Sequence, residues 1–305
     1  MTGQSKHRSF DLLARFVPGL AILALAQGMA FGAVFVNDSF ADGGRNDGVD
    51  AQDTNWWAST ATNAIEVGPG FLGLVSGTSG RGIHGTFASQ TLGIGDTLTA
   101  TYTFTTPATV SSAGVGTGFR AGFFDTTGKP GLAADLSASS GSPNAIYNNL
   151  SGYMTDLDVN TATSDVALRE RTNAASGQLL AATGDYTALG NGGTVGYAFA
   201  ANTSYTGVFS ITRTAAGLDL TGSISQGASL LSTFTASDAT ASTTSFGMLG
   251  FHANSNTFGS SNTVNAADNG IDFSNIRIDF IPAVPEPASA AAISAGLIGL
   301  CRRRK

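Results

Sequence analysis

The chain has 305 residues, of which 42% are hydrophobic and only 12% charged, with 40 glycines and a single cysteine, Cys301. Between the termini, the body (residues 34–280) carries eight Lys or Arg against nineteen Asp or Glu, and its net charge of −11 disfavours nucleic acid or an anionic membrane as partner. No cysteine lies in this body, so it must rest on an apolar core without disulfides, and its length suits one domain.

The first 32 residues predict a secretory signal peptide. Lys6, Arg8 and Arg15 make the start basic, and residues 16–33 form an uncharged apolar run that ends in small residues. Such a segment directs the chain to the Sec translocon, and signal peptidase then removes it. An uncleaved anchor helix is the alternative interpretation of the same run.

An acidic, glycine-rich segment lies early in the body and contains Asp42, Asp47, Asp50 and Asp53. Ca²⁺ prefers oxygen ligands, which makes these four aspartates a candidate calcium site. Their spacing fails the EF-hand pattern, and aspartates and glycines at this density are also typical of a solvated loop. The spacing favours the solvated loop, so we expect no cofactor, with Ca²⁺ as the one candidate.

Trp56 and Trp57 follow directly. Adjacent residues of a strand face opposite ways, so at most one of the two can lie in the core if both are extended. The other either covers an edge of the core or offers an aromatic face on which a sugar ring can stack. Both residues are therefore candidates for glycan stacking.

Short strand patterns fill the rest of the body. Residues 97–104 alternate strictly between apolar residues and threonine, which predicts a half-buried antiparallel strand. Residues 204–213 and 218–224 alternate in the same way around Ala216-Gly217 and predict a hairpin. Further strand candidates are 153–159, 165–171 and the more fully buried 246–251. We expect an all-β fold, an antiparallel β-sandwich over residues 33–281; a β-solenoid lacks a fixed-period repeat to support it.

The closing strand, 270–280, changes phase in its middle. Ile271 and Phe273 keep one phase of the alternation, whereas Ile276 and Ile278 keep the other. A β-bulge at Ser274-Asn275 would return both sets to the core. An early strand over 34–40 and this late strand predict a sandwich whose two ends lie side by side.

The body has few residues that could bind a metal or take part in catalysis. His84 and His252 have no second ligand at metal spacing, so we interpret both as structural or exposed residues. Asp156 and Asp158 share a strand face at a separation that glycosidase carboxylates span, but alternation with apolar neighbours is typical of the wet face of an ordinary strand.

The body resembles the concanavalin A-like, laminin-G-type jelly rolls. The resemblance rests on Asp38-Ser-Phe40, Gly95-Asp-Thr-Leu98 and the closing Ile271-Asp-Phe-Ser-Asn-Ile276. It implies a fold and no function by itself. Laminarinase-like hydrolases of this fold use a Glu-x-Asp-x-x-Glu strand, which this body lacks, because its only glutamates are Glu66 and Glu170.

The chain ends with Val284-Pro285-Glu286-Pro287, an apolar run over 288–300, and Cys301 followed by four basic residues. The two prolines stop helix or strand and leave an exposed peptide around one carboxylate. A helix over 288–301 is about 20 Å long, which is short for a bilayer core of about 30 Å. The basic end would stay on the cytoplasmic side of the membrane.

This tail, residues 282–305, resembles the PEP-CTERM sorting domain of bacterial envelope proteins, which exosortase is thought to process. The resemblance implies that Val284, Pro285, Glu286 and Pro287 form the recognition element. It also implies that Arg302, Arg303 and Arg304 form the cytoplasmic stop after a short transmembrane helix. A plain tail anchor is the alternative.

Together these features predict an exported protein that is held briefly in the inner membrane and then reaches the cell surface or extracellular matrix. We expect a non-catalytic protein associated with the extracellular polysaccharide or biofilm matrix, either as a component of that matrix or as a glycan-binding module. The alternatives are a secreted glycan-active enzyme that uses aspartates and a purely structural surface or adhesion protein.

Overall fold

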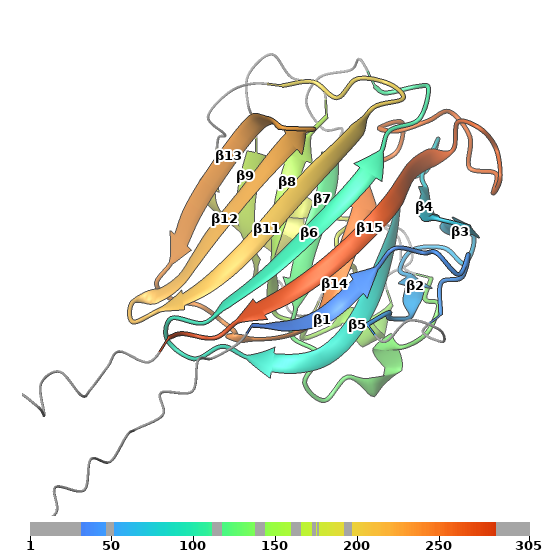
Figure 1. The fold of residues 1–305 in the computed structure, drawn as a ribbon. Coiled ribbons are helices and arrows are strands. Elements are labelled where there is room, and N and C mark those ends of the chain that lie inside the picture. Colours follow the sequence, from blue (N-terminus) through green and yellow to red (C-terminus); the bar gives the residue numbers. More distant parts are fainter. Residues whose placement is uncertain are drawn as a thin grey trace, which may run out of the picture. The chain divides into compact units, whose positions relative to one another are not determined.

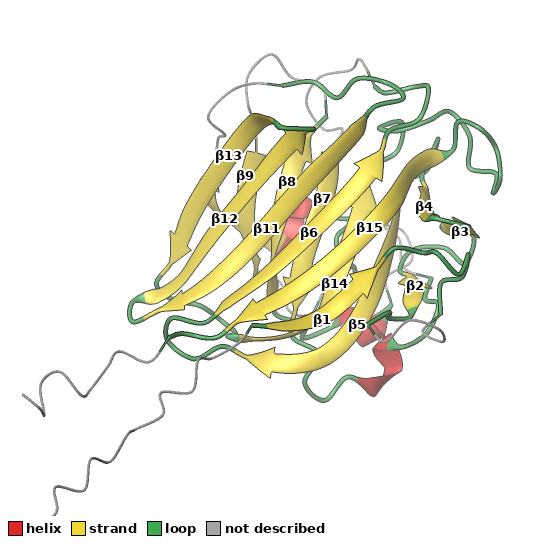
Figure 2. Ribbon diagram, in the orientation of Figure 1, coloured by secondary structure: helices red, strands yellow, loops and turns green. Residues whose placement is uncertain are grey.

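Two antiparallel sheets lie face to face across one apolar core in the computed structural model of the chain (Figure 1; Figure 2). The structure describes residues 32–46, 52–111, 118–137, 144–159, 166–172, 175, 177–191 and 197–284. All of these belong to a single unit that spans residues 30–285. The expected all-β sandwich is confirmed.

Sheet A has the strand order β13-β12-β11-β6-β15-β4-β3, and β1 pairs with β15 beside this path. Its strands are β1 (Ala33–Asp38), β3 (Ile65–Gly68), β4 (Phe71–Val75), β6 (Thr97–Thr105), β11 (Ser204–Thr214), β12 (Gly217–Gln226), β13 (Ser229–Asp238) and β15 (Gly270–Ile281). The predicted hairpin is confirmed as β11 and β12, which pair in register from Thr214 and Gly217 outward.

Sheet B has the strand order β10-β9-β8-β7-β14-β5-β2. Its strands are β2 (Trp56–Ala58), β5 (Arg81–Thr91), β7 (Gly118–Phe124), β8 (Gly152–Asp158), β9 (Val166–Arg171), β10 (Tyr186–Asn191) and β14 (Ser245–Ala253). The described helices are three single 3₁₀ turns: η1 (Pro130–Leu132), η2 (Ala145–Tyr147) and η3 (Thr183–Asp185).

Strands of sheet A in which apolar and polar residues alternate form one side of the core. In β6 the apolar residues Leu98, Ala100, Tyr102 and Phe104 are buried, while the threonines between them face outward. Phe104 meets aromatic rings from both sheets at centroid distances of 5 to 6 Å, which is the usual range for tilted and edge-to-face pairs. Burying one such ring stabilises the fold by about 1.5–3 kcal/mol.

The predicted bulge in β15 is confirmed. The register of β15 against β6 shifts between Phe273 and Asn275. Ile271 and Phe273 on one side of the shift, and Ile276 on the other, are all buried. The expected pairing of the body's two ends is also confirmed, because Ala33 in β1 lies opposite the end of β15.

A second, smaller core covers the outer face of sheet B. The connections between β7 and β8 and between β9 and β10 place apolar side chains against that face. The buried residues of this core are Phe124, Leu132, Tyr147, Leu150, Met154, Leu179, Leu180, Tyr186 and Met248. The central strands β7 and β14 of sheet B are therefore buried on both sides, whereas the outer face of sheet A carries mostly polar residues.

Candidate functional site

Trp56 belongs to the core and is fully buried. Its indole Nε1 donates a hydrogen bond to Oδ2 of Asp38 at 2.8 Å, and Oδ1 of Asp38 accepts one from the backbone N–H of Phe40 at 2.9 Å. Burial raises the pKa of Asp38 to about 6, against the lowering effect of these two hydrogen bonds. The buried position corrects the glycan-stacking interpretation of Trp56, because no ligand can reach its ring.

Trp57 lies on the outer face of β2 and is half-buried. The guanidinium carbon of Arg45 lies 6.0 Å from the centroid of its ring. Arg45 also donates two hydrogen bonds to Asp135, at 2.8 and 2.7 Å, and this pairing holds it in place. Trp57 remains a candidate for glycan stacking, although Arg45 already lies over its ring.

The candidate calcium loop falls mostly outside the described residues. Asp47 and Asp50 are not among them, while Asp42 and Asp53 are. Oδ1 of Asp42 accepts a hydrogen bond from the backbone N–H of Gly44 at 2.8 Å, as in an ordinary Asp turn. In the described part of the chain, no group of three or more His, Cys, Asp or Glu side chains could hold a metal ion.

Polar side chains of sheet B form hydrogen bonds and ion pairs beneath the second core. Arg120 donates to Asp156 at 2.9 Å and to the backbone carbonyl of Leu180 at 2.6 Å. Nε of Arg169 lies 3.3 Å from the other oxygen of Asp156. Two cations therefore compensate this carboxylate, which argues against a catalytic role for an Asp156 and Asp158 pair.

Both histidines of the body are structural. Nε2 of His84 is 2.7 Å from the carbonyl oxygen of Leu132, and burial lowers its pKa to about 4. His252 is also buried, and burial together with nearby Arg120 lowers its pKa well below the usual value.

Two carboxylates meet on the outer face of sheet A. Glu66 in β3 lies opposite Gly73 in β4, and Gly73 lies opposite Asp272 in β15, so the strand register brings both acids to one glycine. A Cβ atom at Gly73 would lie 3.0 Å from Oδ1 of Asp272 and 3.0 Å from Oε1 of Glu66, so these two oxygens are no more than twice that distance apart. The bare backbone of Gly73 forms the floor between them.

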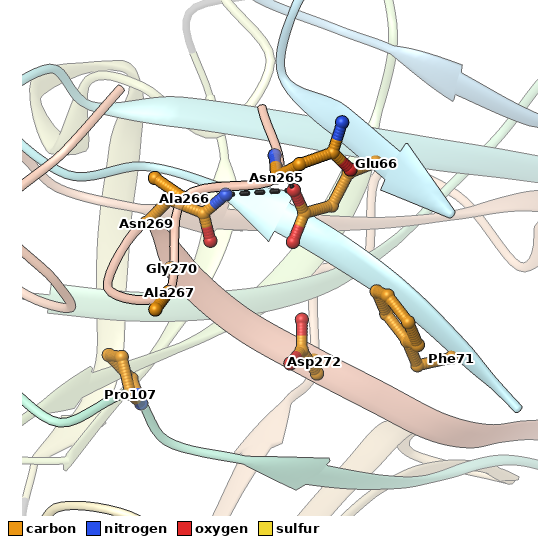
Figure 3. Close-up of a pocket in the computed structure, with 9 residues that line it drawn as sticks. All are labelled: Glu66, Phe71, Pro107, Asn265, Ala266, Ala267, Asn269, Gly270 and Asp272. Carbon is orange, nitrogen blue, oxygen red and sulfur yellow. Dashed lines mark hydrogen bonds between the residues drawn. The ribbon is translucent and has the colours of Figure 1, made fainter. Parts of the chain in front are cut away.

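The loop between β14 and β15 forms the rim of this site. Oε2 of Glu66 accepts hydrogen bonds from the backbone N–H of Asn265 at 2.6 Å and from Nδ2 of Asn269 at 2.8 Å. Asn265 has a positive φ of 64°, which asparagine tolerates better than most residues. In Figure 3 the carboxyl groups of Glu66 and Asp272 point into the space between this loop and the ring of Phe71.

The result is an open pocket of about 310 Å³, which we call the carboxylate pocket. Its lining residues are Glu66, Phe71, Pro107, Asn265, Ala266, Ala267, Asn269, Gly270 and Asp272. No basic side chain is among them. Burial and the neighbouring charge of Glu66 raise the pKa of Asp272 to about 6. The pocket offers hydrogen-bond acceptors and one aromatic wall to a ligand that donates hydrogen bonds.

This pocket was not predicted from the sequence. Asp272 lies on the polar face of the predicted closing strand. Glu66 was named from the sequence only to show that the hydrolase motif is absent, and it was assigned no role. The available signal was Gly73, because a glycine inside a strand often marks a close approach of other groups.

The start of the sorting segment lies at the end of β15. The backbone N–H of Ala283 donates to Asp96 at 2.7 Å, and Val284 is 80% exposed. Pro285, Glu286, Pro287, the expected helix over 288–301 and Arg302 to Arg304 lie outside the described residues, as do residues 1–31 of the expected signal peptide. Within the described ranges, no helix is long and apolar enough to cross a membrane.

Residues 283–305 match the PEP-CTERM protein-sorting motif, which confirms the resemblance seen in the sequence. The chain thus carries the sorting signal of an exported surface protein. Comparison with curated proteins gives no match.

Several solved structures resemble the body. Peanut lectin gives a TM-score of 0.48 at 10% identity, over 83% of this chain and 98% of the lectin. The metal-free carbohydrate recognition domain of Emp46p gives 0.48 at 9%, over 80% and 94%. An endo-1,3-beta-glucanase from Streptomyces sioyaensis gives 0.45 at 12%, over 82% and 97%.

Proposed function

We propose that this chain is exported, sorted to the cell surface and active without catalysis in the extracellular polysaccharide, where it binds glycan through the carboxylate pocket. The sorting motif supports the destination. Export in this scheme uses the Sec translocon and signal peptidase, and an exosortase-type enzyme then processes the tail. The carboxylate pocket is the observation that carries the binding role.

The chemistry of the pocket suits a sugar. Hydroxyl groups donate hydrogen bonds to carboxylate oxygens, and such charge-assisted bonds are stronger than neutral ones. Phe71 offers an apolar surface to the carbon–hydrogen face of a ring, and about 310 Å³ is at the small end of ligand sites. With two carboxylates and no basic group in the lining, the pocket favours neutral or amino sugars over uronic acids.

A glycan array tests the binding role. The wild-type chain should bind a neutral or amino sugar, and both Glu66→Gln and Asp272→Asn should abolish that binding. Trp57→Ala is the comparison, because it removes the remaining stacking candidate on the other sheet. Binding that survives both pocket substitutions but disappears with Trp57→Ala would move the site to the edge of sheet B.

Processing of the tail is tested separately. Glu286→Ala should leave the full-length chain in the membrane, because the carboxylate between the two prolines is the recognition element that we propose. Mass spectrometry of the unmutated extracellular form should find no Arg302. An extracellular protein that keeps its arginine end would refute the processing step.

A second candidate function rests on the same two carboxylates. A carboxyl group with a raised pKa beside a second carboxylate is the arrangement that glycosidases use for an acid and its partner. Turnover of a labelled polysaccharide by the wild type, abolished by Asp272→Asn, would assign a secreted glycan-active enzyme. A chain with neither binding nor turnover would be a purely structural surface protein.

A further inference from the structure

The outer face of sheet A is a regular array of hydroxyl groups. On β6, β11, β12 and β13 most outward positions are Ser or Thr, and the strand register aligns them in rows. One row runs through Thr99, Ser210, Thr221 and Thr235 on four successive strands. Strands lie about 4.8 Å apart and alternate residues about 6.7 Å apart, so the hydroxyl groups repeat on a lattice of those spacings. We call this surface the hydroxyl face; Figure 1 looks onto it.

The hydroxyl groups of this face are linked in cross-strand pairs. Oγ1 of Thr97 lies 2.8 Å from Oγ1 of Thr212, and Oγ1 of Thr99 lies 2.8 Å from Oγ of Ser210. Each pair has two donor hydrogens and four acceptor lone pairs, of which the mutual bond uses one each. The pairs hold the side chains in one orientation and still leave one donor and three acceptors per pair for a ligand.

The hydroxyl face is continuous with the carboxylate pocket. Asp272 lies opposite Thr105 of β6, and Thr105 lies opposite Ser204 of β11. Thr105 and Ser204 are both exposed. The outermost row of the array therefore begins at the pocket, and a ligand longer than one sugar can extend from the pocket across the strands.

Charge and polarity select the kind of ligand. The body has a net charge of −11, yet within the described array the one charged position is Asp219, which accepts a hydrogen bond from Ser237 at 2.7 Å. Beside the array on β15, Arg277 and Asp279 pair with each other. The outward apolar residues of the array are Val208 and Leu230, which lie in different rows, so the described array has no central apolar cluster of the kind that protein interfaces usually contain. Among its described residues the array also has no basic group of the kind that binds anionic polymers. A neutral polyhydroxylated chain matches such a surface.

We infer that the hydroxyl face is an extended binding surface for a neutral polysaccharide, of which the carboxylate pocket holds one sugar. This inference rests on the proposed function and adds to it the ligand class and the course of the polymer across sheet A. Many weak contacts along one chain then give the polymer an affinity that its short fragments lack.

The test compares polymers with fragments on the full chain held in detergent. The probes are soluble α-1,4-glucan, β-1,3-glucan, β-1,4-glucan and mannan, the disaccharide of each, and alginate as an anionic polymer. The triple variant Thr97→Val, Thr99→Val and Thr103→Val removes hydroxyl groups with little change in side-chain volume. The matched control is Thr172→Val with Thr187→Val, a hydroxyl pair 3.0 Å apart on sheet B. Circular dichroism and urea midpoints establish that each variant folds.

We expect the wild type to bind at least one neutral polymer more tightly than its disaccharide. Each lost hydroxyl should weaken polymer binding about fivefold, and the triple variant by on the order of a hundredfold, because one hydrogen bond is lost per side chain. Disaccharide binding should stay unchanged in the triple variant, and the control should match the wild type. Glu66→Gln should lose both polymer and disaccharide.

Three results would overturn the inference. If the triple variant binds polymer like the wild type and Glu66→Gln does not, the hydroxyl face is not a binding surface, and the proposed binding at the carboxylate pocket is still supported. Binding to none of the neutral polymers and disaccharides would remove both. The wild type could also prove dimeric by sedimentation while the triple variant is monomeric and keeps its polymer affinity. The hydroxyl face would then be a contact between two copies of the chain.

Discussion

Replacement of Asp272 by Asn should stabilise the fold at neutral pH while it abolishes glycan binding. Asp272 is partly withdrawn from water and lies beside Glu66, and both effects oppose its ionisation. Asn has nearly the same shape and carries no charge. The substitution therefore removes an unfavourable charge that the unfolded chain does not experience.

The size of the effect follows from the shift in pKa. The folded-state pKa of Asp272 is about 6, against 3.8 in the reference state. Because the folded pKa is the higher one, this group's stabilising contribution is full below pH 4 and is lost as the pH rises through 6. The shift corresponds to about 3 kcal/mol, which solvent screening of a partly exposed group reduces to about 1–2 kcal/mol.

Urea denaturation at pH 4 and pH 7.5 measures this difference. The variant should exceed the wild type in free energy of unfolding by about 1–2 kcal/mol at pH 7.5 and match it at pH 4 or below. Asp279→Asn is the control on the same strand face, because it breaks the ion pair with Arg277 and should cost about 0–1 kcal/mol. An Asp272→Asn variant that is less stable than the wild type at pH 7.5, or a gain that does not change with pH, would refute the reasoning.

Two further predictions concern the core and β15. Trp56→Phe should lower the free energy of unfolding by about 3 kcal/mol, because it removes volume and the hydrogen bond to a buried carboxylate, whereas Trp57→Phe should cost less than about 1 kcal/mol. Equal losses in urea denaturation would contradict these placements. Deletion of Ser274 should be tolerated at a cost of about 1–2 kcal/mol, since it removes the bulge and restores regular alternation. Deletion of Arg277 should cost more than about 3 kcal/mol, because it turns Ile278 out of the core; similar thermal midpoints for the two deletions would argue against the bulge.

The strands that were predicted best from the sequence are those with one buried face and one solvent-exposed face. In β6 and in the β11–β12 hairpin, a buried residue follows each outward Ser or Thr, so a period of two is visible in the sequence. The bulge in β15 was predictable for the same reason, since a slip of one residue is visible against such a pattern.

Strands of sheet B were harder to predict. β7 is buried at every position because the second core covers its outer face, and burial on both sides removes the alternation. β5 and β10 of sheet B were not predicted. In sheet A, β3, β4 and β13 were not predicted either, and β13 carries a register shift near Leu230 that interrupts its pattern. The carboxylate pocket depends on the register of β15 against the β3–β4 hairpin, and β15 is distant from that hairpin in sequence, so no local pattern contains the pocket.

The position of β15 determines how a mechanical load would enter the body. The sorting segment continues from the end of β15, whose edges are bonded to β6 on one side and to β4 and β1 on the other. Because ladder hydrogen bonds are perpendicular to the strands, a pull along the tail strains the bonds of both edges in shear at the same time. A cell-surface attachment through this end would therefore transmit drag from flowing liquid into the strand best able to resist extraction.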